Sequence, residues 1–388
     1  PGNLCHCLAV AMAFLPLTVL AHYDESDRFK LKASVDTLYD DNLFRLSDDQ
    51  SSGVMSRSDT VITPQLQAMY DNTFSRQRIQ LDAAIYSPRY LQNNSMDYTG
   101  HSFSADWLGS VGEKWHPSLG YDNSQSLASF DDVALGLKDM ISEQTFSGGV
   151  AYGGERYAKV LMDGSRKEKD HSSQTWLNLV DQGFGVAGGW ISDAGSQANL
   201  RYDHRDIHFT NPLQAFLTRD YTQQKWQVRT VWPVTNKTRL NADIGRIAWD
   251  FDANGSHSAD YIGSFGAFWR YSEKLQLSGQ FRRDADDPGA NLRVSMSNNY
   301  SLQADWAMTS KLAWNLMWSE RRTKYGVVES SLLPQQKDTT DSYRLGLSWV
   351  PYDYLTSALF VQRQNRDSNA ASADYRDNQY GLNLELRY

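Results

Sequence analysis

Charged and amide side chains recur at every second residue in several stretches, and these groups could bind a polar solute. In residues 222–232, Lys225, Gln227 and Arg229 alternate with apolar residues such as Trp226 and Trp232. Successive side chains of a β-strand point to opposite faces, so this spacing predicts one polar and one apolar face. The polar positions expected to share a wet surface are Arg78, Asp82, Arg201, Asp203, Lys225, Arg229, Arg282, Asp305, Arg344, Glu385 and Arg387.

This mixture of amides and charges of both signs is suited to a hydrated solute, because hydrogen bonds to water exchange for hydrogen bonds to hydroxyls at little net cost. The cations Arg78, Arg201, Lys225, Arg229 and Arg344 would favour anionic sugars if they cluster. Alternatively, they form ion pairs that brace the wall. The spacing leaves both alternatives open.

Residue patterns typical of enzymes and metal sites are weak, and we expect no catalytic residue, cofactor or metal. His171 stands beside Ser172 and Ser173, but nothing marks a third group that would orient a catalytic histidine. The many carboxylates mark no glycosidase pair. His101, His204 and His208 lack the spacing of a metal site, and a P-loop motif is absent.

Three acidic stretches could hold a divalent cation in principle. They are Asp40-Asp41, Asp131-Asp132 and the segment from Asp284 to Gly289. None has the ligand spacing of a calcium loop, so we expect solvated surface loops.

The overall composition excludes two broad classes of protein. The 388 residues carry 38 Lys and Arg against 46 Asp and Glu, a net charge of −8, so the chain lacks the positive excess of a nucleic-acid binder. A mean hydropathy of −0.57 argues against a bundle of membrane-spanning helices. The 12 Trp and 21 Tyr are typical of membrane-interface belts, because their rings combine an apolar body with a polar tip.

The apolar run from Leu8 to Ala21 predicts a secretory signal over residues 1–21, truncated at its N-terminal side; a buried N-terminal helix is the alternative. Cys5 and Cys7 both lie upstream of this run, so the mature chain from residue 22 would contain no cysteine. A chain without thiols is suited to passage through an oxidising periplasm.

Aromatic residues precede short polar turns at a spacing near 40 residues, which predicts a belt at the membrane interface. These residues are Tyr70, Trp107, Tyr152, Trp190, Trp232, Trp269, Trp306 and Trp349. Eight short turns and nine longer connections imply 18 strands, within a range of 16–18, over residues 22–388. An even count with short turns at one rim and long loops at the other predicts an all-β transmembrane outer-membrane β-barrel, with short periplasmic turns and longer extracellular loops. A periplasmic sandwich or solenoid and a propeller are the alternatives, and residues 116–150 could extend a strand or fold inward as a plug.

Several local sequences resemble the EpsL-type outer-membrane proteins of exopolysaccharide loci, part of a broader β-barrel porin group. The resemblance is carried by the segments from Tyr39 to Leu46 and from Arg219 to Leu240, together with the Trp-centred hairpins. It implies a bacterial outer-membrane barrel encoded with exopolysaccharide synthesis and export machinery, and it implies no catalytic residue.

We therefore expect a channel that passes a hydrated polysaccharide or other polar solute through a polar lumen. Its expected partners are outer-membrane lipid, the solute and periplasmic export machinery, with no nucleic acid. The alternatives are a plugged barrel that binds polysaccharide or assists assembly and, more remotely, an outer-membrane hydrolase.

Overall fold

The structure is a computed structural model that describes residues 27–48, 56–131, 137–153, 157–211, 220–252, 256–286, 294–325 and 335–388. The predicted signal segment lies outside these ranges. The strands are β1 (Phe29–Asp40), β2 (Asp59–Phe74), β3 (Gln77–Tyr86), β4 (Arg89–Tyr90), β5 (Gly100–Gly109), β6 (Trp115–Leu127), β7 (Met140–Tyr152), β8 (Tyr157–His171), β9 (Leu179–Ile191), β10 (Gln197–Phe209), β11 (Tyr221–Pro233), β12 (Thr238–Phe251), β13 (Ser256–Arg270), β14 (Leu275–Asp286), β15 (Ser295–Ala307), β16 (Leu312–Tyr325), β17 (Lys337–Tyr352), β18 (Leu355–Ser368) and β19 (Tyr375–Arg387).

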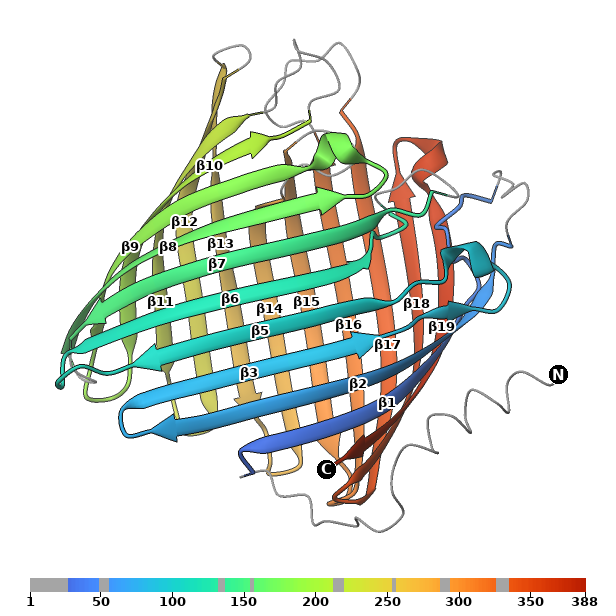
Figure 1. The fold of residues 1–388 in the computed structure, drawn as a ribbon, viewed down its shortest axis with the longest axis horizontal. Helices are drawn as coiled ribbons and strands as arrows, with labels where there is room; N and C mark the ends of the chain where they lie inside the picture. Colours follow the sequence, from blue (N-terminus) through green and yellow to red (C-terminus); the bar gives the residue numbers. More distant parts are fainter. Residues whose placement is uncertain are drawn as a thin grey trace.

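These strands form one closed antiparallel sheet (Figure 1). Except at β3 and β4, each strand pairs with its neighbours along the chain, and β1 pairs with β19 from Lys32 opposite Arg387 to Asp40 opposite Gln379. The two-residue β4 pairs with β2 beyond the end of β3, so β3 and β4 occupy one strand position. The predicted barrel of 18 strand positions is therefore confirmed.

Regular structure outside the barrel wall is limited in the described residues to three short 3-10 helices, at Asn94–Met96, Thr175–Leu177 and Ala371–Ala373. No helix among the described residues is long and apolar enough to cross a membrane.

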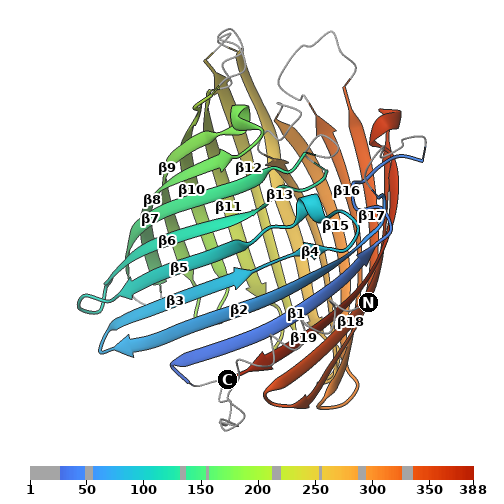
Figure 2. The same cartoon turned by 45° about the vertical axis from the view of Figure 1, so that its right-hand side comes forward.

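Short turns and long connections alternate between the two rims. Residues 75–76 and 353–354 are typical of the short-turn rim, whereas residues 41–58 and 369–374 connect strands at the long-loop rim. The start of β1 lies opposite Tyr70, and the last residue, Tyr388, exchanges two backbone hydrogen bonds with Leu31. Both ends of the described barrel therefore lie at the short-turn rim, as the turned view also shows (Figure 2).

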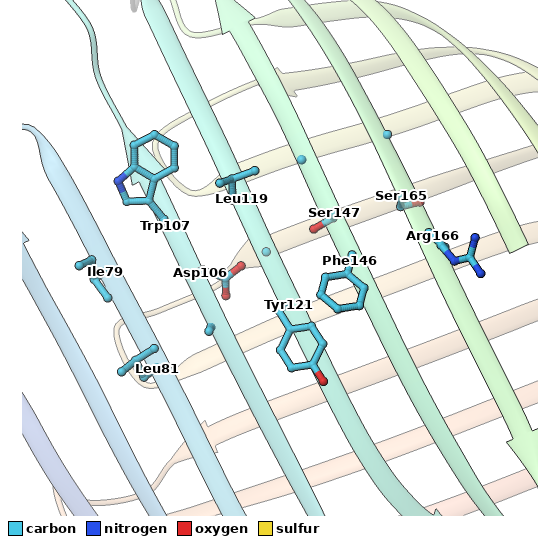
Figure 3. Close-up of a pocket in the computed structure, with 14 residues that line it drawn as sticks. Ile79, Leu81, Asp106, Trp107, Leu119, Tyr121, Phe146, Ser147, Ser165 and Arg166 are labelled. Atoms are coloured by element: carbon cyan, nitrogen blue, oxygen red, sulfur yellow. The ribbon is translucent and has the colours of Figure 1, made fainter. Parts of the chain in front are cut away.

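The strand register gives the barrel an apolar exterior and a polar lumen. Residues directly opposite each other in an antiparallel pair share a face, so one parity can be followed around the whole sheet. Val35 lies opposite Leu384, and Leu316 lies opposite Leu345, on the apolar face. In Figure 3, Tyr121 and Phe146 project toward the viewer while the opposite wall lies behind them, so this apolar face is the exterior. Closure pairs the strand edges that an open sheet would expose to lipid.

The end of the β14–β15 hairpin folds over the lumen. β13 pairs with β14 only up to Gly263 opposite Arg283, whereas β14 and β15 stay paired to Asp286 opposite Ser295. Met296 there joins a buried cluster with lumen-facing residues of β10 to β13. The cluster consists of Ile207, Phe209, Tyr221, Ile247, Trp249, Ile262, Val294 and Met296.

The connection after β1 also folds inward at the long-loop rim. Its residues Leu43, Phe44 and Leu46 are buried in a cluster with Val61 and Tyr90 of the inner wall. The Phe44 ring also contacts Phe130, which follows β6, with centroids 4.9 Å apart. We expected residues 116–150 to extend a strand or to fold inward as a plug. Residues 116–127 and 140–150 belong to the strands β6 and β7, and residues 132–136 of the connection between them lie outside the described ranges.

Candidate functional site in the lumen wall

The strand register places all eleven predicted polar residues on the face opposite the apolar exterior. They lie on β3, β10, β11, β14, β15, β17 and β19. For example, Arg201 lies opposite Gln227, and Asp203 lies opposite Lys225. Whether these residues contact a passing solute stays a prediction.

A polar hollow of about 330 Å³ lies in the wall formed by β11 to β14. Lys225, Arg229 and Arg282 line it together with Asp284. Arg282 Nη2 lies 2.5 Å from an Asp284 carboxylate oxygen, and Lys225 Nζ lies 3.9 Å from the other. Asp284 therefore lies near the end of β14 with its side chain on the lumen face, whereas we expected it in a solvated loop; residues 287–289 of that segment lie outside the described residues.

Arg229 differs from its neighbours because its side chain is exposed and no acid pairs with it among the described residues. Including Arg283 and Asp243, four cations and two carboxylates line this hollow. Arg283 pairs with Asp260 at 2.7 Å and Arg282 pairs with Asp284, so the positive charge of Arg229 favours an anionic or strongly hydrogen-bonding solute at this part of the wall.

Arg201 lies between two carboxylates on the neighbouring wall. Its Nη1 and Nη2 donate to Asp163 at 2.9 and 2.8 Å, and its Nε donates to Asp203 at 2.7 Å. Asp163 is on β8, two strands away, and Gly185 of β9 lies between them without a side chain to block the contact. Arg201 thus fits the alternative in which lumen cations brace the wall.

The other predicted lumen residues are distributed around the barrel. Arg78 pairs with Asp71, Asp82 accepts a hydrogen bond from Gln67 at 2.7 Å, and Arg387 pairs with Glu385. Of the five cations considered together, Arg201, Lys225 and Arg229 lie on adjacent strands, whereas Arg78 and Arg344 lie on other parts of the wall. The clustering that would favour anions is therefore partial.

Asp40 and Asp41, at the end of β1, were expected in a solvated loop, but Asp40 is buried.

 The Asp40 side chain is almost fully enclosed and lies beside Asp377 of β19, so the expectation of a solvated loop fails for it. Arg45 reaches back from the inward-folded connection, and its Nη1 lies 3.1 Å from Asp40 and 3.0 Å from Asp377. Burial alone would lower the pKa of Arg45, but the two carboxylates outweigh it and raise that pKa. The guanidinium therefore supplies the positive charge at this seam between the first and last strands.

His171 is part of a buried polar contact at the long-loop rim. Its Nδ1 lies 2.7 Å from Asp139, which also accepts a hydrogen bond from the backbone N–H of Ser173 at 2.8 Å. Burial alone would raise the pKa of Asp139, but the hydrogen bonds it accepts outweigh this and lower the pKa. These contacts fix the end of β8 to the connection that precedes β7, so they have a structural explanation.

The sequence did not indicate the apolar cluster at the long-loop end of the lumen. Ile247 and Trp249 lie on the same face of β12 as Asn241 and Asp243, so parity alone would assign them to the wet surface. Their burial depends on the folded-over end of the β14–β15 hairpin. The sequence signal that could have identified this cluster is a pair of large apolar residues at positions of a strand that otherwise carry polar side chains.

The eight aromatic residues of the predicted belt all lie on the exterior parity next to the short-turn rim. Six of them are among the exposed large apolar side chains, with Trp232 exposed by 57% and Trp349 by 51%. Large apolar side chains at the protein surface are expected where that surface faces a bilayer. Their contact with lipid headgroups stays a prediction.

No family model matches the chain, and no curated protein matches it. Among solved structures, OccK2 (OpdF) of Pseudomonas aeruginosa in complex with glucuronate is similar, with a TM-score of 0.54 and 12% identity over 95% of this chain and 100% of that chain. OccK9 (OpdG) of the same organism is similar with a TM-score of 0.52 and 12% identity, over 93% of this chain and 98% of that chain. OccAB3 of Acinetobacter baumannii is similar with a TM-score of 0.51 and 8% identity, over 93% of this chain and 99% of that chain. At these identities the likeness establishes the fold alone, which is that of outer-membrane porins.

Proposed function

We propose that the protein is an outer-membrane channel that passes a hydrated polar solute, with a preference for acidic sugars. The observation that carries this proposal is the polar hollow of β11 to β14, where the exposed Arg229 has no acid partner among the described residues. A closed barrel of 18 strands is too wide for side chains to fill, so its polar inner face is suited to hold water.

Two further observations support the choice of solute. The similar structure of OccK2 was solved in complex with glucuronate, an acidic sugar. The resemblance to EpsL-type proteins connects the chain with exopolysaccharide export, and we propose that an exopolysaccharide or its acidic units are the cargo. In this proposal a signal peptide directs the chain through the periplasm, and the short turns remain on the periplasmic side.

A second candidate function is a plugged barrel that binds polysaccharide or assists assembly. The two inward-folded segments favour it, because Phe44 and Met296 both pack inside the long-loop end of the barrel. Arg366 of β18 also lies 3.5 Å from Asp131 of the connection after β6, which links distant parts of that rim.

Single-channel conductance of the refolded full chain in planar bilayers separates these functions. We expect steady ion conductance that acidic polysaccharide reduces, because the polymer would occupy a water-filled lumen. Replacement of Lys225 and Arg229 by Gln should lower the preference for anions, measured as the reversal potential in a salt gradient. A folded, inserted protein without conductance would contradict the channel and support the plugged barrel.

A further inference from the structure

A second hollow, of about 400 Å³, lies near the short-turn rim and holds a guanidinium stacked on an aromatic ring. Arg344 of β17 and Phe360 of β18 line this hollow together with Asn315 and Asp305. The guanidinium carbon of Arg344 is 3.8 Å from the centre of the Phe360 ring. At this distance the cation is attracted to the face of the ring, so the side chain has a preferred position.

A glycine in the next strand determines where the Phe360 ring lies. Phe360 is opposite Gly381 of β19 on one side and opposite Gly346 of β17 on the other. A Cβ atom at Gly381 would lie only 2.0 Å from a ring carbon of Phe360, whereas a Cβ at Gly346 would meet no atom closer than 3.7 Å. The ring therefore covers Gly381, and any side chain there would displace it.

Asp305, one of the two acids that line the hollow, has other partners. Asp305 accepts hydrogen bonds from Asn315 at 2.6 Å and from Gln303 at 2.9 Å. Over the described part of the chain, Arg344 forms no ion pair and donates no side-chain hydrogen bond. Its N–H groups are thus oriented by the ring but are available to a solute.

We propose that Arg344, held on Phe360 above Gly381, is a binding site for the carboxylate of an acidic sugar in the lumen. A guanidinium can donate two parallel hydrogen bonds to a carboxylate, and an orientation fixed in advance lowers the entropy cost of binding. Asn315 and Asp305 in the same hollow could meet the hydroxyl groups of the sugar. This proposal rests on the proposed channel function and locates one of its solute contacts.

The test measures how D-glucuronate reduces single-channel current, with D-glucose as the neutral control. We expect Arg344→Gln to weaken glucuronate block roughly tenfold, because one charge-assisted contact is lost. Gly381→Ala should weaken it as well, although it changes no charge, because the new Cβ displaces Phe360 and with it the guanidinium. Gly346→Ala is the matched control, and glucuronate should block its current as strongly as that of the unchanged protein.

Phe360→Leu provides a second variant that removes the ring without adding atoms above Gly381, and it should behave like Gly381→Ala. Folding of each variant is checked by the change in gel mobility on boiling. Conductance with equal glucuronate block in all variants would overturn the Arg344 site while leaving the channel intact. Absence of conductance in the unchanged protein would instead contradict the channel itself.

Discussion

At the scale of single residues, the lumen cations differ in whether a carboxylate pairs with them, even where both are arginines. Arg201 is held between Asp163 and Asp203, whereas Arg229 is exposed in a wall hollow without an acid partner in the described chain. Strand parity predicts the face of each residue but not this difference. Asp163 lies on β8 and Arg201 on β10, and their contact depends on the space above Gly185 of the strand between them.

Gly185→Ala tests that space, and Gly188→Ala on the same strand is its control. A Cβ at Gly185 would lie 2.3 Å from Nη2 of Arg201, whereas a Cβ at Gly188 would meet nothing within 4 Å. We expect Gly185→Ala to lower the free energy of unfolding by about 1 kcal/mol, because it displaces a partly exposed ion pair. Gly188→Ala should raise it by about 0.4–1 kcal/mol, since alanine restricts the unfolded chain. Urea unfolding in detergent measures both, and equal effects would contradict this account.

At the scale of elements, the strands were predictable in number and less so in length. Alternation identified 18 strands because short polar turns interrupt it regularly. The polar segment 165–173 is typical of a connection in sequence, yet β8 continues to His171. The reason is that both faces of a strand are polar above the apolar band, while its backbone still pairs with β7 and β9. The inward-folded connection after β1 could not be predicted either, because parity has no meaning outside a strand.

Trp249→Ala tests whether the end of the β14–β15 hairpin is held by the inner wall. Trp249 is only 1% exposed and packs in the cluster that contains Met296. We expect a loss of about 3–5 kcal/mol in unfolding free energy, typical of removing a fully buried Trp. We also expect higher or noisier single-channel current, because the hairpin end loses its support. Trp232→Ala at the exterior belt is the control, and it should leave the current unchanged; identical currents in both variants would argue against a supported hairpin.

At the scale of the whole molecule, the alternation of apolar and polar residues corresponds to the two solvents that the barrel separates. Leu302 is 58% exposed on the exterior of β15, and Gln303 beside it contacts Asp305 on the lumen face. The fold class could therefore be derived from sequence, whereas the solute contacts could not, because they depend on neighbours from three or more strands.

Leu302→Arg and Gln303→Arg place the same charge on the two sides of the wall. We expect Leu302→Arg to cost about 2–4 kcal/mol of unfolding free energy in lipid, because its charge would lie in the apolar band. Gln303→Arg should cost far less, since the lumen is wet and Asp305 can pair with the new cation. Folding into lipid vesicles, followed by gel mobility with and without boiling, gives the comparison. A similar cost for both would contradict the assignment of exterior and lumen.

The pairing of β1 with β19 makes the docking of β19 a condition for closing the wall. Until β19 is synthesised and docked, β1 has no partner on one side, and its backbone groups would meet hydrocarbon without hydrogen-bond partners. A truncation that removes β19 should therefore be far more damaging than the loss of its 13 residues suggests, because β1 and β18 would each keep an unpaired edge.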